Sequence, residues 1–210
     1  MENIASQIIN WIKTYAENAR VKGLVIGVSG GVDSAVVSTL CARTGLPTLC
    51  LEMPIHQAES HVSRAEEHIA FLKAHYPNVS NLRTDLTPVF DQFVTEIPPT
   101  DKSTYEMALA NTRARLRMTT LYYFAGLEGY IVVGTGNKIE DFGVGFFTKY
   151  GDGGVDISPI ADLMKSEVYK LGEYLHIPKS ILKAKPSDGL FGDDRSSDIT
   201  KGGSKQAAPF

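Results

Sequence analysis

The stretch Val25-Ile-Gly-Val-Ser-Gly-Gly-Val-Asp-Ser-Ala35 decides how the rest of the chain is interpreted. It predicts an apolar strand over residues 24–28, a tight glycine turn, and a helix over about residues 33–41. Gly30 and Gly31 have no Cβ, so the backbone N–H groups of the turn can come close to a ligand. These N–H groups and the positive end of the following helix predict an anion-binding site.

Three polar side chains in this turn suit a phosphate ligand. Ser29 and Ser34 offer hydroxyl donors, and Asp33 either caps the helix or holds a Mg²⁺ that is bound to phosphate. The turn is not a Walker A loop, because no Gly-Lys-Ser/Thr follows at the required spacing. An ordinary Gly-Gly turn with an N-capping aspartate is the alternative reading.

Composition limits the class of protein. The 210 residues are 43% hydrophobic, enough for one domain with a substantial core. The formal net charge of -3 provides no general field for nucleic acid or an anionic membrane. Cys41 and Cys50 lack metal-site spacing and are expected to be reduced core residues. No apolar run is long enough to span a membrane, and the first residues do not form a signal peptide, so a cytoplasmic location is expected.

Strands and helices are expected to alternate along the chain. An amphipathic helix opens it, and we expect strands at 46–53, 81–86 and 130–134 and helices at 58–75 and 104–126. Three prolines limit any helix in residues 87–101. This order predicts an α/β fold with a doubly wound parallel sheet. In such sheets ligands bind at the carboxyl ends of the strands, where the winding direction reverses.

The expected long helix carries three arginines in Asn111-Thr-Arg-Ala-Arg-Leu-Arg-Met118. Helical spacing puts Arg113 and Arg117 on one face and Arg115 on another. A guanidinium suits phosphate or carboxylate, whereas a solvated helix face is the other reading.

Polar motifs follow the expected fourth strand. Gly134-Thr-Gly-Asn-Lys-Ile-Glu140 offers the hydroxyl of Thr135 and a hard oxygen on Glu140 for Mg²⁺, or is only a glycine-rich turn before a helix. Residues 145–160 gather Lys149, Asp152 and Asp156 around three glycines.

Two further polar groups lie near the end of the chain. Lys165 stands in the first turn of a helix, against the helix dipole, which favours a task such as neutralising a phosphate. Ser187 places a hydroxyl in a loop.

Five motifs in this order resemble those of ammonia-dependent NAD synthetase, a family of N-type ATP pyrophosphatases. They are Ser-Gly-Gly-Val-Asp-Ser, Asn-Thr-Arg-Ala-Arg-Leu-Arg-Met, Gly-Thr-Gly-Asn-Lys-Ile-Glu, Phe-Thr-Lys-Tyr-Gly-Asp-Gly-Gly-Val-Asp and Lys-Pro-Ser-Asp-Gly-Leu. The resemblance covers residues 1–195 as one domain and implies a Rossmann-like, three-layered fold of the adenine nucleotide alpha hydrolase type. It also implies a homodimer with the dinucleotide site at the subunit interface. Residues 196–210 are expected to form a poorly ordered tail.

The resemblance implies the following site residues. The phosphate loop would comprise Ser29, Gly30, Gly31, Val32, Asp33, Ser34, Ala35 and Val36, and further ATP contacts would come from Arg115, Thr135, Lys165 and Ser187. Lys149, Asp152 and Asp156 would contact deamido-NAD, Asp33 and Glu140 would hold Mg²⁺, and Asp33, Lys165 and Asp152 would serve the chemistry.

The implied reaction is ATP-dependent amidation of deamido-NAD with ammonia, which gives NAD, AMP and pyrophosphate. The chain departs from the family at its end, where a His-Lys pair that would meet the dinucleotide is missing. We therefore expect near-normal ATP affinity but weak deamido-NAD binding. The alternatives are another ATP pyrophosphatase ligase, such as a GMP synthetase module or a tRNA-modifying enzyme, or a truncated nucleotide-binding subunit without full activity.

Overall fold

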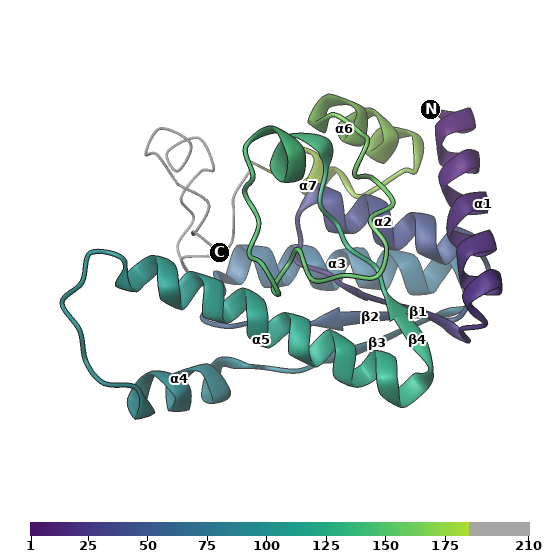
Figure 1. Cartoon of the computed structure of the whole chain (residues 1–210). Coiled ribbons are helices and arrows are strands. Elements are labelled where there is room, and N and C mark those ends of the chain that lie inside the picture. The colour runs from purple at the N-terminus through teal and green to yellow at the C-terminus, as the bar shows by residue number, and fades with distance from the viewer. Residues whose placement is uncertain (185–210) are drawn as a thin grey trace.

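A four-stranded parallel sheet forms the centre of the computed structural model, which describes residues 1–184 (Figure 1). Its strands are β1 (Gly23–Gly27), β2 (Thr48–Glu52), β3 (Val79–Arg83) and β4 (Tyr130–Val132). They lie in the order β3-β2-β1-β4, and every neighbouring pair is parallel. Alternating strands and helices therefore predicted the parallel sheet correctly.

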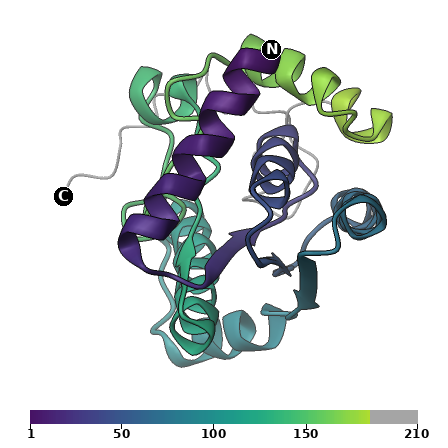
Figure 2. The same cartoon turned by 90° about the vertical axis from the view of Figure 1, so that its right-hand side faces the viewer.

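Helices cover both faces of the sheet, so the three-layered α/β fold is confirmed (Figures 1 and 2). On the side of one face lie α1 (Glu2–Ala19), α2 (Val32–Arg43) and α3 (Glu59–His75), with α6 (Lys165–Tyr174) and the short α7 (Lys179–Leu182) packed against α2. The other face packs against α4 (Thr87–Glu96) and α5 (Tyr105–Glu128). None of the helices within residues 1–184 is long and apolar enough to cross a membrane.

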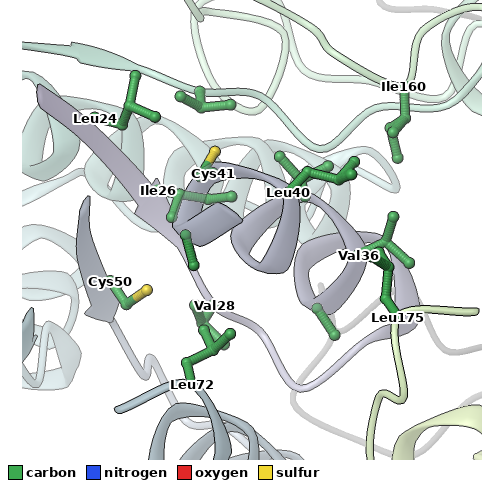
Figure 3. Close-up of a cluster of buried hydrophobic side chains, with 14 of the residues drawn as sticks. Leu24, Ile26, Val28, Val36, Leu40, Cys41, Cys50, Leu72, Ile160 and Leu175 are labelled. Atoms are coloured by element: carbon green, nitrogen blue, oxygen red, sulfur yellow. The ribbon is translucent and has the colours of Figure 1, made fainter. Parts of the chain in front are cut away.

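The larger core lies between the sheet and α2. Ile26, Leu40 and Leu72 are fully buried there, and Figure 3 shows them with their neighbours from the sheet, α2 and α3. Cys41 and Cys50 are free thiols in this core, as expected. Burial raises the pKa of both thiols, that of Cys50 to about 12, so they are inert packing residues.

Residues 87–101 contain a helix that the prolines had seemed to limit. α4 begins at Thr87, and Pro88 lies in its first turn. A first-turn residue has no intrahelical partner for its N–H group, so proline is tolerated there. The third strand also differs from the expectation: β3 runs from Val79 to Arg83 and so begins before the expected range of residues 81–86.

The strand order places the switch point of the sheet between β1 and β4. The chain winds from β1 through β2 to β3 in one direction, and β4 then pairs with the opposite edge of β1. The segments that leave the carboxyl ends of β1 and β4 therefore face each other across one crevice.

Candidate functional site

The turn after β1 is held in a fixed shape by its own hydroxyl groups. The N–H of Ser29 donates to Oγ of Ser34 at 3.2 Å, and Oγ of Ser34 donates to the carbonyl of Gly31 at 3.0 Å. Gly30 has a φ of +80°, and a Cβ there would lie 2.4 Å from the carbonyl oxygen of His61 in α3. Glycine is therefore required for both the backbone conformation and the contact with α3.

Asp33 does not cap α2. Gly31 occupies the N-cap position without a side-chain bond, and Asp33 lies inside the first turn. Its Oδ1 accepts a hydrogen bond from Nδ2 of Asn137 at 2.9 Å, and its Oδ2 accepts one from Nζ of Lys165 at 2.5 Å. The capping interpretation is wrong, because the carboxylate points across the crevice instead.

Lys165 stands between two carboxylates. Its Nζ also donates to Oε1 of Glu140 at 3.0 Å, so oxygens from Asp33 and Glu140 converge on one cation. Burial alone would lower the pKa of Lys165, but the two carboxylates raise it above its usual value. These partners explain why a lysine is stable at the first position of α6, where the helix dipole opposes it.

Asn137 links the two carboxylates and was missed by the sequence analysis. Its side chain is fully buried; besides donating to Asp33, its Oδ1 accepts hydrogen bonds from the N–H groups of Ile139 at 3.1 Å and Glu140 at 3.2 Å. These bonds start the π-helical turn η1 (Ile139–Gly143) that carries Glu140. The one signal that could have indicated this role is an asparagine placed between two segments that carry candidate ligands, at a position expected to be buried.

These groups line a cavity of about 410 Å³ at the switch point. The predicted residues that line it are Ser29, Gly30, Gly31, Val32, Asp33, Ser34, Thr135, Glu140, Asp152 and Lys165. Asp141 also lines it, and burial raises its pKa to about 6, with Glu140 adding to the shift. Burial likewise raises the pKa of Asp152, against the hydrogen bond from the N–H of Thr148 at 2.8 Å. The cavity thus combines the glycine turn after β1 with several carboxylates.

Arg113 and Arg117 share the inner face of α5 and Arg115 points outward, as the spacing predicted. Arg117 donates from Nε to the carbonyl of Met53 at 3.0 Å and from Nη2 to Oε1 of Gln57 at 2.9 Å. Burial lowers the pKa of Arg117 to about 10. The guanidinium of Arg113 lies over the ring of Phe90 at 4.4 Å. A solvated face is therefore the wrong interpretation of Arg113 and Arg117, which fasten α5 to its neighbours.

Several predicted site residues do not line this cavity. Ala35 and Val36 pack in the core, and the N–H of Ala35 donates to the carbonyl of Gly31, so neither presents a group to a ligand. Arg115 donates from Nε to the carbonyl of Lys149 at 3.1 Å. Asp156 accepts hydrogen bonds from the hydroxyl of Tyr122 at 2.9 Å and the N–H of Val132 at 2.7 Å. Ser187 lies outside the described residues.

The donor set suits a magnesium ion that accompanies a phosphate. Among residues 1–184 no group of three or more His, Cys, Asp or Glu side chains is arranged to hold a metal. Mg²⁺ commonly binds through one or two carboxylates together with substrate phosphates, so a complete protein cage is not needed. The oxygens of Asp33 and Glu140 already surround one cation, the ammonium of Lys165, beside the anion-binding turn.

The sequence is similar to those of one known protein family. The sequence model of the NAD synthase family matches residues 4–201. An NH(3)-dependent NAD(+) synthetase from Carboxydothermus hydrogenoformans is 37% identical over 197 residues, which cover 90% of this chain and 76% of the relative. The enzyme of the same description from Methanococcoides burtonii is 40% identical and is covered over 68% of its length, as against 88% of this chain.

Solved structures agree with the sequence comparison. The structure of NMN synthetase from Francisella tularensis matches with a TM-score of 0.88 and 35% identity, covering 96% of this chain and 81% of that one. An NH3-dependent NAD synthetase from Campylobacter jejuni matches with a TM-score of 0.77 and 32% identity, covering 87% of this chain and 76% of that one.

Proposed function

Because the chain belongs to the NAD synthase family, we propose that it joins ammonia to the nicotinate carboxylate of deamido-NAD at the expense of ATP. The products are NAD, AMP and pyrophosphate, so the protein is a carbon–nitrogen ligase. The observation that carries the proposal is Lys165 between Asp33 and Glu140, directly across the crevice from the Ser29 turn. This arrangement provides charges of both signs for a metal-bound triphosphate.

The reaction divides into two substitutions. An oxygen of the nicotinate carboxylate attacks the α-phosphorus of ATP, and pyrophosphate leaves with the electrons of the broken P–O bond. Ammonia then attacks the acyl carbon of the resulting adenylate, AMP leaves, and the nitrogen loses a proton. Neither step requires a side-chain nucleophile, and we assign the protein's part to alignment and charge neutralisation.

Each part of the cavity has a role in this scheme. The turn from Ser29 to Ser34 binds phosphate, Thr135 offers a hydroxyl, and Lys165 neutralises charge that develops on the leaving pyrophosphate. Asp33 and Glu140 would hold Mg²⁺, which supplies Lewis-acid stabilisation of the phosphates when bound. Asp152, in the wall of the cavity, is proposed to lie near the path of ammonia.

The residues outside the cavity fit the proposal that the active protein is a homodimer. Lys149 and Asp156 were expected at deamido-NAD, and the family resemblance implies a dinucleotide site between subunits. The helices α4 and α5 also expose large apolar side chains, namely Val89, Phe93, Tyr123 and Leu127. A twofold contact through this surface would be self-complementary. Sedimentation at micromolar concentration should give a dimer, and a monomer alone would contradict both the dimer and the interfacial site.

A second candidate product is NMN, because the chain also resembles an NMN synthetase. The same nicotinate carboxylate would then be carried by a mononucleotide rather than a dinucleotide. The GMP synthetase alternative has no such support.

We propose that the protein is located in the cytoplasm.

The test is to measure AMP release with ATP, Mg²⁺, ammonium and one acceptor at a time. Deamido-NAD should yield both AMP and NAD, and xanthosine monophosphate should yield no AMP. Faster turnover of nicotinate mononucleotide would favour the NMN alternative. Turnover only with xanthosine monophosphate would refute the proposed function.

A further inference from the structure

Glu52 ends β2 beside the anion-binding turn. Gly27 pairs with Leu51, and the N–H of Val28 donates to the carbonyl of Leu51 at 2.9 Å. Glu52 therefore lies next to Val28, one residue before Ser29. Its side chain is only 6% exposed, yet it lines the same cavity as the turn. No role has been assigned to it above.

The carboxylate of Glu52 lacks a complete set of partners. Its Oε2 is buried and has no hydrogen-bond partner among the described residues. Arg83 is its neighbour in β3, but the guanidinium of Arg83 donates to Glu66 at 2.6 Å. Burial raises the pKa of Glu52 and the carboxylate of Glu66 adds to that shift, while the charge of Arg83 and a hydrogen bond with the side chain of Asn81 oppose it. An unpartnered buried carboxylate oxygen destabilises a fold, so it calls for a functional explanation.

The cavity indicates what meets this oxygen. Its phosphate-binding groups lie between the ends of β1 and β4, and it continues to the ends of β2 and β3, where Glu52, Met53, Arg64 and Arg83 line it. The nucleoside of a triphosphate held by the turn has room in this part of the cavity. The hydrogen-bond donors of that nucleoside are the 6-amino group of adenine and the ribose hydroxyls.

We propose that Glu52 determines nucleotide specificity by accepting a hydrogen bond from the nucleoside of ATP. The inference rests on the proposed function, because it assumes that the anion bound at the Ser29 turn is the triphosphate of ATP. An analogue without the donor leaves the buried oxygen unpaired, and discrimination against such analogues is strong for that reason.

The experiment measures equilibrium binding of ATP, inosine triphosphate, 2′-deoxy-ATP and 3′-deoxy-ATP without deamido-NAD. The variants are Glu52→Met, which removes the acceptor at similar size, and Glu52→Gln, which keeps one acceptor oxygen. The unaltered protein should bind one analogue about 10-fold or more weakly than ATP. Glu52→Met should weaken the binding of ATP by a similar factor, so that ATP and that analogue bind with equal affinity. Glu52→Gln should bind ATP with intermediate affinity. Inosine triphosphate identifies the amino group as the donor, and the deoxy analogues identify a hydroxyl.

The matched control is Glu67→Gln, which removes a neighbouring carboxylate of α3 that accepts a hydrogen bond from Oγ of Ser180 at 2.5 Å and does not line the cavity. It should leave the affinity ratios unchanged. Thermal unfolding of Glu52→Met should occur at the same temperature or higher, because a buried charge is removed. If Glu52→Met weakens ATP and all analogues equally, or none of them, the inference is wrong while the proposed function stands. If the unaltered protein binds no ATP, the proposed function itself fails and the inference fails with it.

Discussion

The phosphate side and the proposed dinucleotide side of the site are built differently. On the phosphate side, Asp33, Asn137 and Lys165 are joined by hydrogen bonds and are buried or half-buried within one chain. On the dinucleotide side, Lys149 and Asp156 are exposed and lie outside the cavity, whereas Asp152 is exposed in the cavity wall. The proposed phosphate side is therefore preorganised in the single chain. On the proposed dinucleotide side, Asp156 is held by Tyr122 and Val132 of the same chain, and no described hydrogen bond joins Lys149, Asp152 and Asp156 to one another.

The largest effect should come from Asp33→Asn. This change removes the charge that faces Lys165 and the proposed metal, and we expect turnover to fall by about 10²- to 10³-fold. Glu140→Gln should act in the same direction. The measurement is the rate of AMP release as a function of Mg²⁺ concentration. The control is Glu167→Gln, whose side chain only accepts the N–H of Met164 at the start of α6. Normal turnover by Asp33→Asn would show that the preorganised carboxylate of Asp33 is not needed for the reaction, and the contrast between the two sides would not hold.

Acid should lower the free energy of unfolding through His68, a buried residue that contacts α2. His68 is fully buried and its Nε2 lies 2.9 Å from Oγ of Ser38 in α2. Burial lowers the pKa of His68 from its usual value to about 4. His68 therefore binds a proton near pH 6.5 in the unfolded chain but only near pH 4 in the folded protein. The contribution of neutral, buried His68 to the free energy of unfolding should be fully present above pH 6.5. The free energy of unfolding should then fall by about 3 kcal/mol as the pH drops towards 4.

Urea unfolding at a series of pH values measures this loss. His68→Phe provides the comparison, because phenylalanine cannot take up a proton. The variant should lose about 3 kcal/mol less than the unaltered protein between pH 7.5 and pH 4. Equal losses in the two proteins would show that His68 does not titrate in this way.

Asn137→Ala should reduce turnover by about 10- to 100-fold, as loss of an orienting partner of a ligand typically does. Asp33 would lose one of its two donors and keep Lys165, and the turn that carries Glu140 would lose its cap. The matched control is Asn78→Ala, since Nδ2 of Asn78 donates to the carbonyls of Ala42 and Leu46 away from the cavity. Both variants should lose stability, but only Asn137→Ala should need more Mg²⁺ for half-maximal turnover.

The smallest effect should come from the dinucleotide side. Lys149→Ala should raise KM for deamido-NAD by about 10-fold and leave KM for ATP unchanged, because removal of one charged contact costs about that factor. Asp156→Asn should act in the same sense, with some loss of stability through Val132 and Tyr122. A rise in KM for ATP instead would show that the two sides are not separate.

The amino-acid sequence alone determined the alternation of strands and helices and the glycine turn after β1, and it singled out Asp33, Glu140 and Lys165, which meet in the structure. These features are local: hydrophobic periodicity specifies an element, and Gly30 specifies a backbone conformation. The same reasoning was less accurate for α4, because a proline that ends one helix can start another.

Only the tertiary structure decided how these segments meet. The hydrogen bond from Asn137 to Asp33 joins positions 104 residues apart, and that from Lys165 to Asp33 joins positions 132 residues apart. Both depend on β4 pairing with the free edge of β1, which brings the two carboxyl ends together. The unpartnered oxygen of Glu52 has the same origin, because Arg83 turns to Glu66 on α3 instead. Such contacts follow from packing across the sheet, and no local pattern of residues records them.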